Sequence, residues 1–144
     1  MNNETRADLL KDEYIMLQNF YEDIDNKGLT IKSWAITVAV AVIGTGILYR
    51  KEILLVGVFV SLVFWYLEAY WRGLSHFFSA RIQNIERAFQ TEQWQDEVPL
   101  QVYSTWAKEY EKSGDQTLRY MRKPSSYLPH VLIAAVYLGL YFWF

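Results

Sequence analysis

The sequence contains no cysteine and no excess of positive charge. Without cysteine, the chain cannot form disulfides, thiolate metal ligands or a thiol nucleophile. The formal net charge is −2 at pH 7, and lysine and arginine are spread along the polar segments instead of forming one long basic run. Proteins that bind nucleic acid usually concentrate positive charge on one surface, so no nucleic-acid partner is expected.

Residue groups that commonly carry catalysis or hold a metal are also missing. The two histidines, His76 and His130, stand far apart in the sequence, and no carboxylates gather with them at ligand spacing. The chain has no phosphate-binding glycine loop, no nucleophile elbow and no serine, histidine and aspartate set at a favourable spacing. We therefore expect neither an enzyme nor a bound metal or cofactor.

Three apolar segments are present, at residues 33–49, 53–71 and 126–144. As helices, the first two cover about 26 and 28 Å, close to the ~30 Å hydrocarbon core of a bilayer. The third is long enough only if its helix continues to the last residue. The sequence therefore predicts an all-α integral membrane protein with three transmembrane helices and a small helical cytosolic part. The alternative is two spans and a third helix packed on the bundle.

The third apolar segment has features of a helix start and of a membrane interface. Pro129 would break a helix interior, but it costs nothing in a first turn, where Ser125 or Ser126 can cap the helix. The aromatic cluster at residues 141–144 is typical of the depth where a bilayer meets water. We expect this helix to start near Ser126 and to cross the bilayer.

We expect a single structural unit that consists of residues 1–32, 33–71, 72–125 and 126–144. Its polar segments predict how it is oriented in the membrane. The first of these lacks the apolar core of a cleavable secretory signal. Residues 1–32 and 72–125 share one side, because 33–71 forms a tight hairpin. That side holds most basic residues near the membrane ends, namely Lys27, Lys32, Arg72, Arg81, Arg87, Arg119, Arg122 and Lys123. The bias predicts a cell-membrane protein with a cytoplasmic N-terminus and a C-terminus on the outer side.

The last three basic residues of that series form a cluster just before the third apolar segment. Arg119, Arg122 and Lys123 enforce this topology most simply, and they also attract anionic lipid.

The N-terminal polar segment has the pattern of an amphipathic helix over residues 8–26. Its apolar residues recur at spacings of four and three, which predicts one packing seam: Leu10, Tyr14, Leu17, Tyr21 and Ile24. The seam fits packing within the chain or packing between subunits, and two and a half heptads favour the first. Residues 25–28 predict a helix stop or bend.

Beyond Gly73, the second span continues as a long helix with an apolar stripe over residues 74–89. The opposite stripe, which includes Glu68, Arg72 and His76, is expected to face water. Residues 92–99 break the pattern, a short helix follows at 100–112, and residues 113–115 end it.

Glu68 and Arg72 interrupt an otherwise apolar, aromatic run, and their spacing of four lets them pair on one helix face. Bare charge is costly in hydrocarbon, so the pair is expected at the boundary with water, among Trp65, Tyr66, Tyr70 and Trp71. Two interpretations remain open. The pair is an interfacial anchor, or it lines a pore or gate together with His76.

Small residues in the first span permit close helix contact: Ala35, Ala39, Gly44 and Gly46. Contact within the hairpin and contact between subunits are both compatible with this pattern.

The N-terminal helix, the tight hairpin at 33–71 and the helical extension at 74–89 resemble the plan of small bacterial membrane effectors in antiviral conflict systems, such as the SLATT family. This architectural resemblance covers roughly the first ninety residues. It implies an oligomer that perturbs the membrane when a cytosolic partner or signal engages it, and it implies no role for any single residue.

These features predict a homo-oligomeric effector that forms a pore or channel-like assembly, gated through its cytosolic helices, in antiviral defence. A chain with three spans has too few helices to enclose a path alone. The alternative is a non-conducting scaffold or accessory subunit that docks a partner through exposed aromatic residues, namely Trp94, Tyr103, Trp106 and Tyr110.

Overall fold

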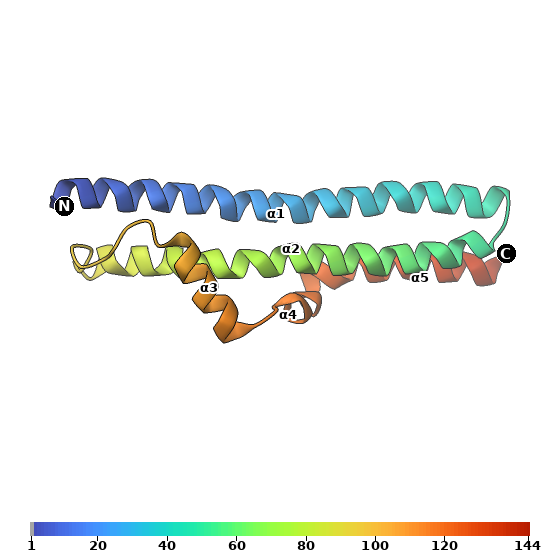
Figure 1. The fold of residues 1–144 in the computed structure, drawn as a ribbon. Helices are drawn as coiled ribbons and strands as arrows, with labels where there is room; N and C mark the ends of the chain where they lie inside the picture. Colours follow the sequence, from blue (N-terminus) through green and yellow to red (C-terminus); the bar gives the residue numbers. More distant parts are fainter. Residues whose placement is uncertain (1) are drawn as a thin grey trace. The chain divides into compact units, whose positions relative to one another are not determined.

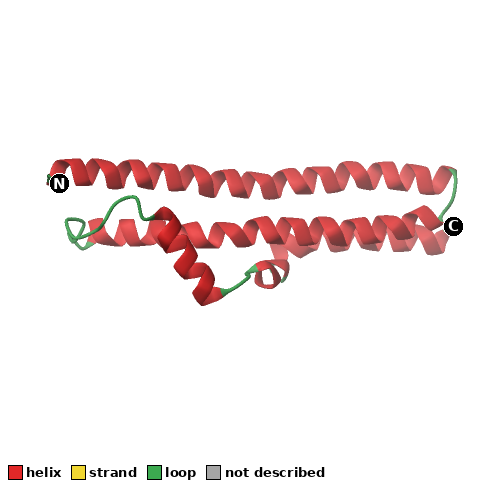
Figure 2. Ribbon diagram, in the orientation of Figure 1, coloured by secondary structure: helices red, strands yellow, loops and turns green. Residues whose placement is uncertain are grey.

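The structure is a computed structural model that describes residues 2–144, and every regular element in that range is a helix. The helices are α1 (Asn3–Leu48), α2 (Glu52–Gln90), α3 (Val102–Ser113), α4 (Thr117–Met121) and α5 (Pro124–Trp143), drawn in Figures 1 and 2. The predicted all-α class is confirmed.

The described chain forms two compact units. The first unit joins the described residues up to Asp25 to Gly73–Gln116, and the second unit joins Asn26–Arg72 to Thr117–Phe144. Both α1 and α2 contribute residues to each unit.

The predicted helix stop at residues 25–28 is wrong, because α1 continues through it. Gly28 is buried, and a Cβ atom added there would lie 3.0 Å from Nε of Arg72. The glycine therefore leaves room for the Arg72 side chain. Packing of this kind overrides the weak preference of a single glycine for non-helical backbone.

The predicted continuation of the second span is confirmed, since α2 extends to Gln90 without a break at Gly73. The short helix expected at 100–112 is α3, which begins at Val102 because Leu100 has a φ of 64°. Gly114, also with positive φ, follows the last turn of α3, as expected of a helix stop. The five-residue helix α4 had no counterpart in the predicted layout.

The start predicted near Ser126 for the third apolar helix agrees with the structure to within two residues, but the first-turn position predicted for Pro129 is wrong. Helix α5 begins two residues earlier, with Pro124 in its first turn, and Pro129 lies inside the helix. Lys123 occupies the N-cap position and no side chain caps the helix, so neither Ser125 nor Ser126 has the capping role expected of it.

Three helices, α1, α2 and α5, are long and apolar enough to cross a membrane by length and composition. Within the second unit, residues 26–48, 52–72 and α5 measure about 35, 32 and 30 Å at 1.5 Å per residue, which suits a ~30 Å hydrocarbon core.

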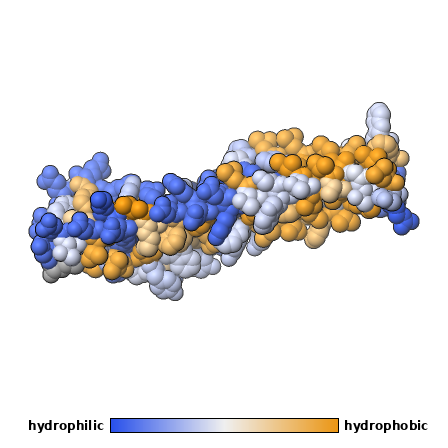
Figure 3. Space-filling model, turned by 90° about the horizontal axis from the view of Figure 1, so that it is seen from above, coloured by the Kyte–Doolittle hydropathy of each residue, from blue (hydrophilic) through white to orange (hydrophobic). Residues whose placement is uncertain are grey.

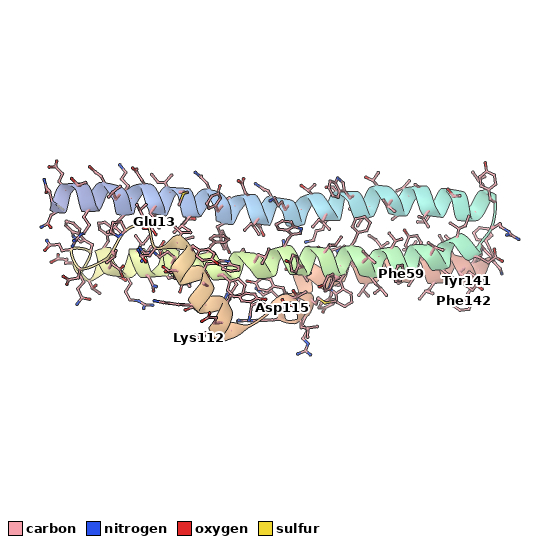
Figure 4. The ribbon with its side chains drawn as sticks, in the orientation of Figure 1. Glu13, Phe59, Lys112, Asp115, Tyr141 and Phe142 are labelled. Carbon is pink, nitrogen blue, oxygen red and sulfur yellow. The ribbon has the colours of Figure 1, made fainter. Side chains whose placement is uncertain are left out.

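The second unit exposes large apolar side chains and buries many small ones. Val40, Phe59 and Leu132 are 68, 66 and 61% exposed, whereas Ala35 and Ala69 are buried. Apolar side chains cover much of the face of this unit seen in Figure 3, and Phe59 is labelled in Figure 4. A water-soluble bundle would place these residues the other way round, so this surface suits lipid.

The first unit has an ordinary apolar core. Leu10 and Leu17 of α1 pack with Ile82 and Ile85 of α2, and Tyr14 lies against them. Of the predicted seam, Ile24 is also buried, whereas Tyr21 is 40% exposed. Four of the five seam residues thus pack within this chain.

Candidate functional site

A fully buried carboxylate lies between the three apolar helices of the second unit. Glu68 of α2 is 0% exposed, and its Oε1 lies 3.1 Å from Nζ of Lys32 on α1 and 3.3 Å from Nε of Arg72, one turn along α2. Its Oε2 lies 3.0 Å from Nε2 of His130 on α5. These four residues, called the charge cluster below, connect all three apolar helices.

The contacts on the two oxygens of Glu68 differ in kind. Neither cation approaches Oε1 with hydrogen-bond geometry, so the attraction there is electrostatic. The contact between Oε2 and His130 has hydrogen-bond geometry. A carboxylate has no proton to donate in its ionised form, so Nε2 of His130 is the donor.

Pro129 explains how α5 joins the cluster. Proline has no backbone N–H, so Pro129 cannot bond to the carbonyl four residues earlier, which belongs to Ser125. That carbonyl instead accepts a hydrogen bond of 2.7 Å from Nζ of Lys32. The Ser125 hydroxyl oxygen also accepts one of 3.2 Å from Nη1 of Arg72. The internal proline thus creates an acceptor for a cation on α1.

His130 is 1% exposed and is held on both sides. Its backbone carbonyl accepts a 3.0 Å hydrogen bond from Oγ of Ser61 on α2. Its Nδ1 has no hydrogen-bond partner among residues 2–144, and neither does the buried Oγ of Ser126, one turn earlier on the same helix face. The side chain therefore uses only one of its two ring nitrogens.

The expectation that Glu68 faces water is wrong, because three helices enclose it. Arg72 is only partly exposed. Of the surrounding aromatic residues, Tyr66 and Tyr70 are 49 and 41% exposed, while Nε1 of Trp65 donates to the carbonyl of Met121 at 3.1 Å. The expected pairing of Glu68 with Arg72 is present, but the pair is part of a larger enclosed group.

His76, the third residue proposed for a pore or gate, belongs to the first unit. It is partly buried, and its ring centroid lies 5.7 Å from that of Phe77. Its proposed role stays a prediction.

Lys32 and His130 were not assigned to the site from the sequence, although a signal existed. In the predicted topology, the start of span one, the end of span two and the start of span three lie at the same membrane face. Lys32, Glu68 and His130 occupy those three positions. Comparison of the expected membrane depths of the ionisable residues would have indicated that these three side chains lie close together.

Most of the small residues singled out in the first span lie inside the second unit. Ala35, Ala39 and Gly46 are buried, and a Cβ atom on Gly46 would lie 2.8 Å from the Leu54 side chain across the hairpin. A Cβ atom on Gly44 would meet nothing within 4 Å. Gly44 therefore remains the one of the four that is open to a neighbouring helix.

The first unit contains a second buried ion cluster that the sequence did not reveal. Arg81 of α2 bonds both oxygens of Glu13 on α1, at 2.9 and 3.1 Å, and an oxygen of Glu97 at 3.0 Å. Glu13, labelled in Figure 4, also accepts from the backbone N–H groups of Leu100 and Gln101. These hydrogen bonds attach the loop before α3 to both α1 and α2.

This second cluster is saturated with hydrogen bonds, which indicates a structural clamp. Burial alone would lower the pKa of the Arg81 guanidinium, but the hydrogen bonds to Glu13 and Glu97 outweigh it and raise that pKa. Arg81 therefore stays charged at any physiological pH. The sequence contained one indication of this cluster, because the acidic residue Glu13 lies between Leu10 and Leu17 at the spacing of the buried seam.

The basic cluster before α5 lies at the surface. Arg119, Arg122 and Lys123 are exposed, and Nζ of Lys123 lies 3.7 Å from the ring centroid of Tyr120. Their roles in topology and lipid binding stay predictions.

In chemical terms, the charge cluster holds α1, α2 and α5 together through ion pairs and a hydrogen bond. Within residues 2–144, no three histidine, cysteine, aspartate or glutamate side chains are grouped to hold a metal ion. Comparison with family models, with curated proteins and with solved structures gives no match.

Proposed function

We propose that this chain is an integral membrane protein whose copies assemble into a pore or channel-like effector, gated through the first unit. The observation that carries the proposal is a stripe of small and hydroxyl-bearing residues on the outside of α1. This α1 stripe consists of Ser33, Thr37, Ala41, Gly44 and Thr45.

The α1 stripe differs from the rest of the second unit's exterior. Ser33, Thr37, Ala41 and Thr45 recur every four residues and are exposed, and Gly44 is open beside them. Most of the remaining surface offers large apolar side chains to lipid, with Ala135 and Gly139 of α5 as small exceptions. Small residues at such spacing let two helix backbones approach closely, which is the usual basis of helix association in a bilayer.

The hydroxyl groups of the stripe also suit a polar path. Oγ1 of Thr37 donates to the carbonyl of Ser33 at 2.9 Å, and Oγ1 of Thr45 donates to the carbonyl of Ala41 at 2.8 Å. Each proton is thus used within the helix, and each oxygen keeps acceptor capacity for water or a cation.

The charge cluster argues for a path between copies and against one through a single copy. Glu68 and His130 lie buried in the interior of the bundle, where Glu68 contacts Lys32 of α1, Arg72 of α2 and His130 of α5. Two surfaces were expected to line a path, namely span one and the face that carries Glu68 and Arg72. The charge cluster therefore favours span one.

The proposed gate is the first unit on the cytoplasmic side, an orientation that rests on the distribution of basic residues. Because α1 and α2 belong to both units, a partner or signal that binds the first unit acts on the helices that carry the stripe. A role in antiviral defence is part of this proposal and rests on the architectural resemblance alone.

The test compares two open glycines. Neither Gly44 on α1 nor Gly139 on α5 has anything within 4 Å of an added Cβ atom. The purified protein is expected to have the mass of an oligomer in mild detergent and to release ions from lipid vesicles. Gly44→Leu should lower both the oligomer fraction and the ion flux, whereas Gly139→Leu should leave both unchanged.

A monomeric wild-type protein would contradict the proposal. So would equal effects of the two substitutions, because the α1 stripe would then have no special role.

A second candidate function is a non-conducting scaffold, favoured by an apolar groove of about 510 Å³ in the first unit. Leu10, Tyr14, Ile85 and Phe89 line it, with Asp8, Lys11 and Glu86 beside them. Of the aromatic residues first considered for docking, Trp94 and Trp106 are partly buried and stack on Phe89 and Tyr110, whereas Tyr103 is 78% exposed. Vesicles that keep their ion gradient, together with a partner that co-purifies at fixed stoichiometry, would favour this function.

A further inference from the structure

The two nitrogens of the His130 ring are in unequal surroundings. Nε2 donates to Glu68, whereas Nδ1 is buried and has no hydrogen-bond partner among the described residues. In the neutral ring, Nδ1 carries only a lone pair, and leaving this acceptor without a hydrogen bond costs little free energy. In the doubly protonated ring, it would carry a buried N–H group and a share of positive charge without an acceptor.

The charges that face His130 oppose a second proton. Glu68 and Arg72 come from α2 and Lys32 from α1, and together they already hold two cations against one carboxylate. With a neutral histidine, the cluster has a net charge of about +1, and protonation at Nδ1 would double it. Such an excess is costly inside helices that are apolar enough to span a bilayer.

The N-terminal part of α5 is attached through the same few groups, whereas Tyr137 further along the helix packs with Ala39 and Leu54. Lys32 and Arg72 bond to Ser125, Ser61 bonds to the carbonyl of His130, and Glu68 bonds to its ring. If α5 moves away from the other two helices, water reaches Nδ1 and the extra charge is solvated. Proton binding and displacement of α5 are therefore coupled.

We propose that the pair formed by Glu68 and His130 is a proton-binding site, and that a proton bound at Nδ1 of His130 releases the N-terminal part of α5 from α1 and α2. The proton comes from water and no other bond is made or broken. Histidine is suited to this role because its charge changes most readily near neutral pH. The inference concerns one copy of the chain and holds whether or not copies form a pore.

The test measures the distance between α2 and α5 in lipid vesicles. Because the chain has no cysteine, spin labels can be attached at two introduced cysteines, Phe59→Cys and Leu132→Cys, which replace exposed residues. Lowering the pH from about 8 to about 5, where histidine gains charge, is expected to shift the measured distance to longer values. The shift should reverse when the pH is raised again.

Two variants test whether the pH-dependent distance change comes from His130. His130→Gln keeps an N–H donor for Glu68 but cannot gain a proton, so its distance should stay short at both pH values. His76→Gln removes the other histidine and should respond as the wild type does. In that variant His130 is the only histidine, and its imidazole NMR signals should titrate together with the distance change.

Three results would overturn the proposal: a wild-type distance that does not change with pH, a shift that survives in His130→Gln, or a His130 titration that does not coincide with the distance change. If His130→Gln does not fold, the single-histidine variant still decides the question.

Discussion

At the scale of the residue, the carboxylate of Glu68 shows how much depends on one side chain. It offsets one of the two positive charges of Lys32 and Arg72 and orients His130, so it sets the charge balance of the cluster. Isolated charges at such positions are expensive, whereas mutually paired ones are tolerated.

Replacing Glu68 should therefore destabilise the protein strongly. Glu68→Ala leaves two cations without their carboxylate, and removal of one partner of a buried pair costs about 3 to 5 kcal/mol. Glu52, an exposed acidic residue in the first turn of α2, gives the matched control Glu52→Ala. The measurement is the free energy of unfolding in mixed micelles. Equal stability of the two variants would show that the cluster contributes little.

At the scale of the element, glycine and proline have packing roles that the sequence pattern did not disclose. Gly28 looked like a helix stop, yet it leaves room for Arg72, and Pro129 looked like a helix start, yet it frees a carbonyl for Lys32. Both roles depend on residues distant in sequence. Local preference alone could not show them.

Gly57 gives a sharper test of helix packing. A Cβ atom there would lie 2.7 Å from the Tyr137 ring on α5 and 2.8 Å from Val42 on α1, so Gly57→Ala should lower stability by about 1 to 3 kcal/mol. Gly139→Ala, at an open position of α5, should be neutral or slightly stabilising because alanine favours the helix. Thermal unfolding of both variants in detergent measures the difference. A Gly57→Ala variant as stable as Gly139→Ala would contradict the close packing of α2 against α5.

Most of what the sequence predicted correctly at this scale followed from long patterns. The continuation of α2 past Gly73 and the apolar helix at the C-terminus rest on many residues acting together, whereas the end of α3 followed from the local turn signal at residues 113–115. The charge cluster was only half predicted. The spacing of Glu68 and Arg72 is visible within one helix, whereas contact with Lys32 and His130 depends on how three helices pack.

At the scale of the whole molecule, the account depends on the solvent of the second unit. Its exposed surface consists largely of residues such as Val40, Phe59 and Phe142, which water would not favour. Its interior contains paired charges and small residues. The same chain thus combines a first unit packed for water with a second unit suited to lipid.

Labelling of introduced cysteines with a membrane-impermeant maleimide tests this claim most directly, since the natural chain has no cysteine to react. Lys51→Cys, at the hairpin tip, should react on intact cells, and Lys112→Cys, at the end of α3, should react only after the cells are opened. Val40→Cys, whose parent side chain is 68% exposed, should react in neither case because lipid covers it. Ready reaction of Val40→Cys with the water-borne reagent would contradict the account.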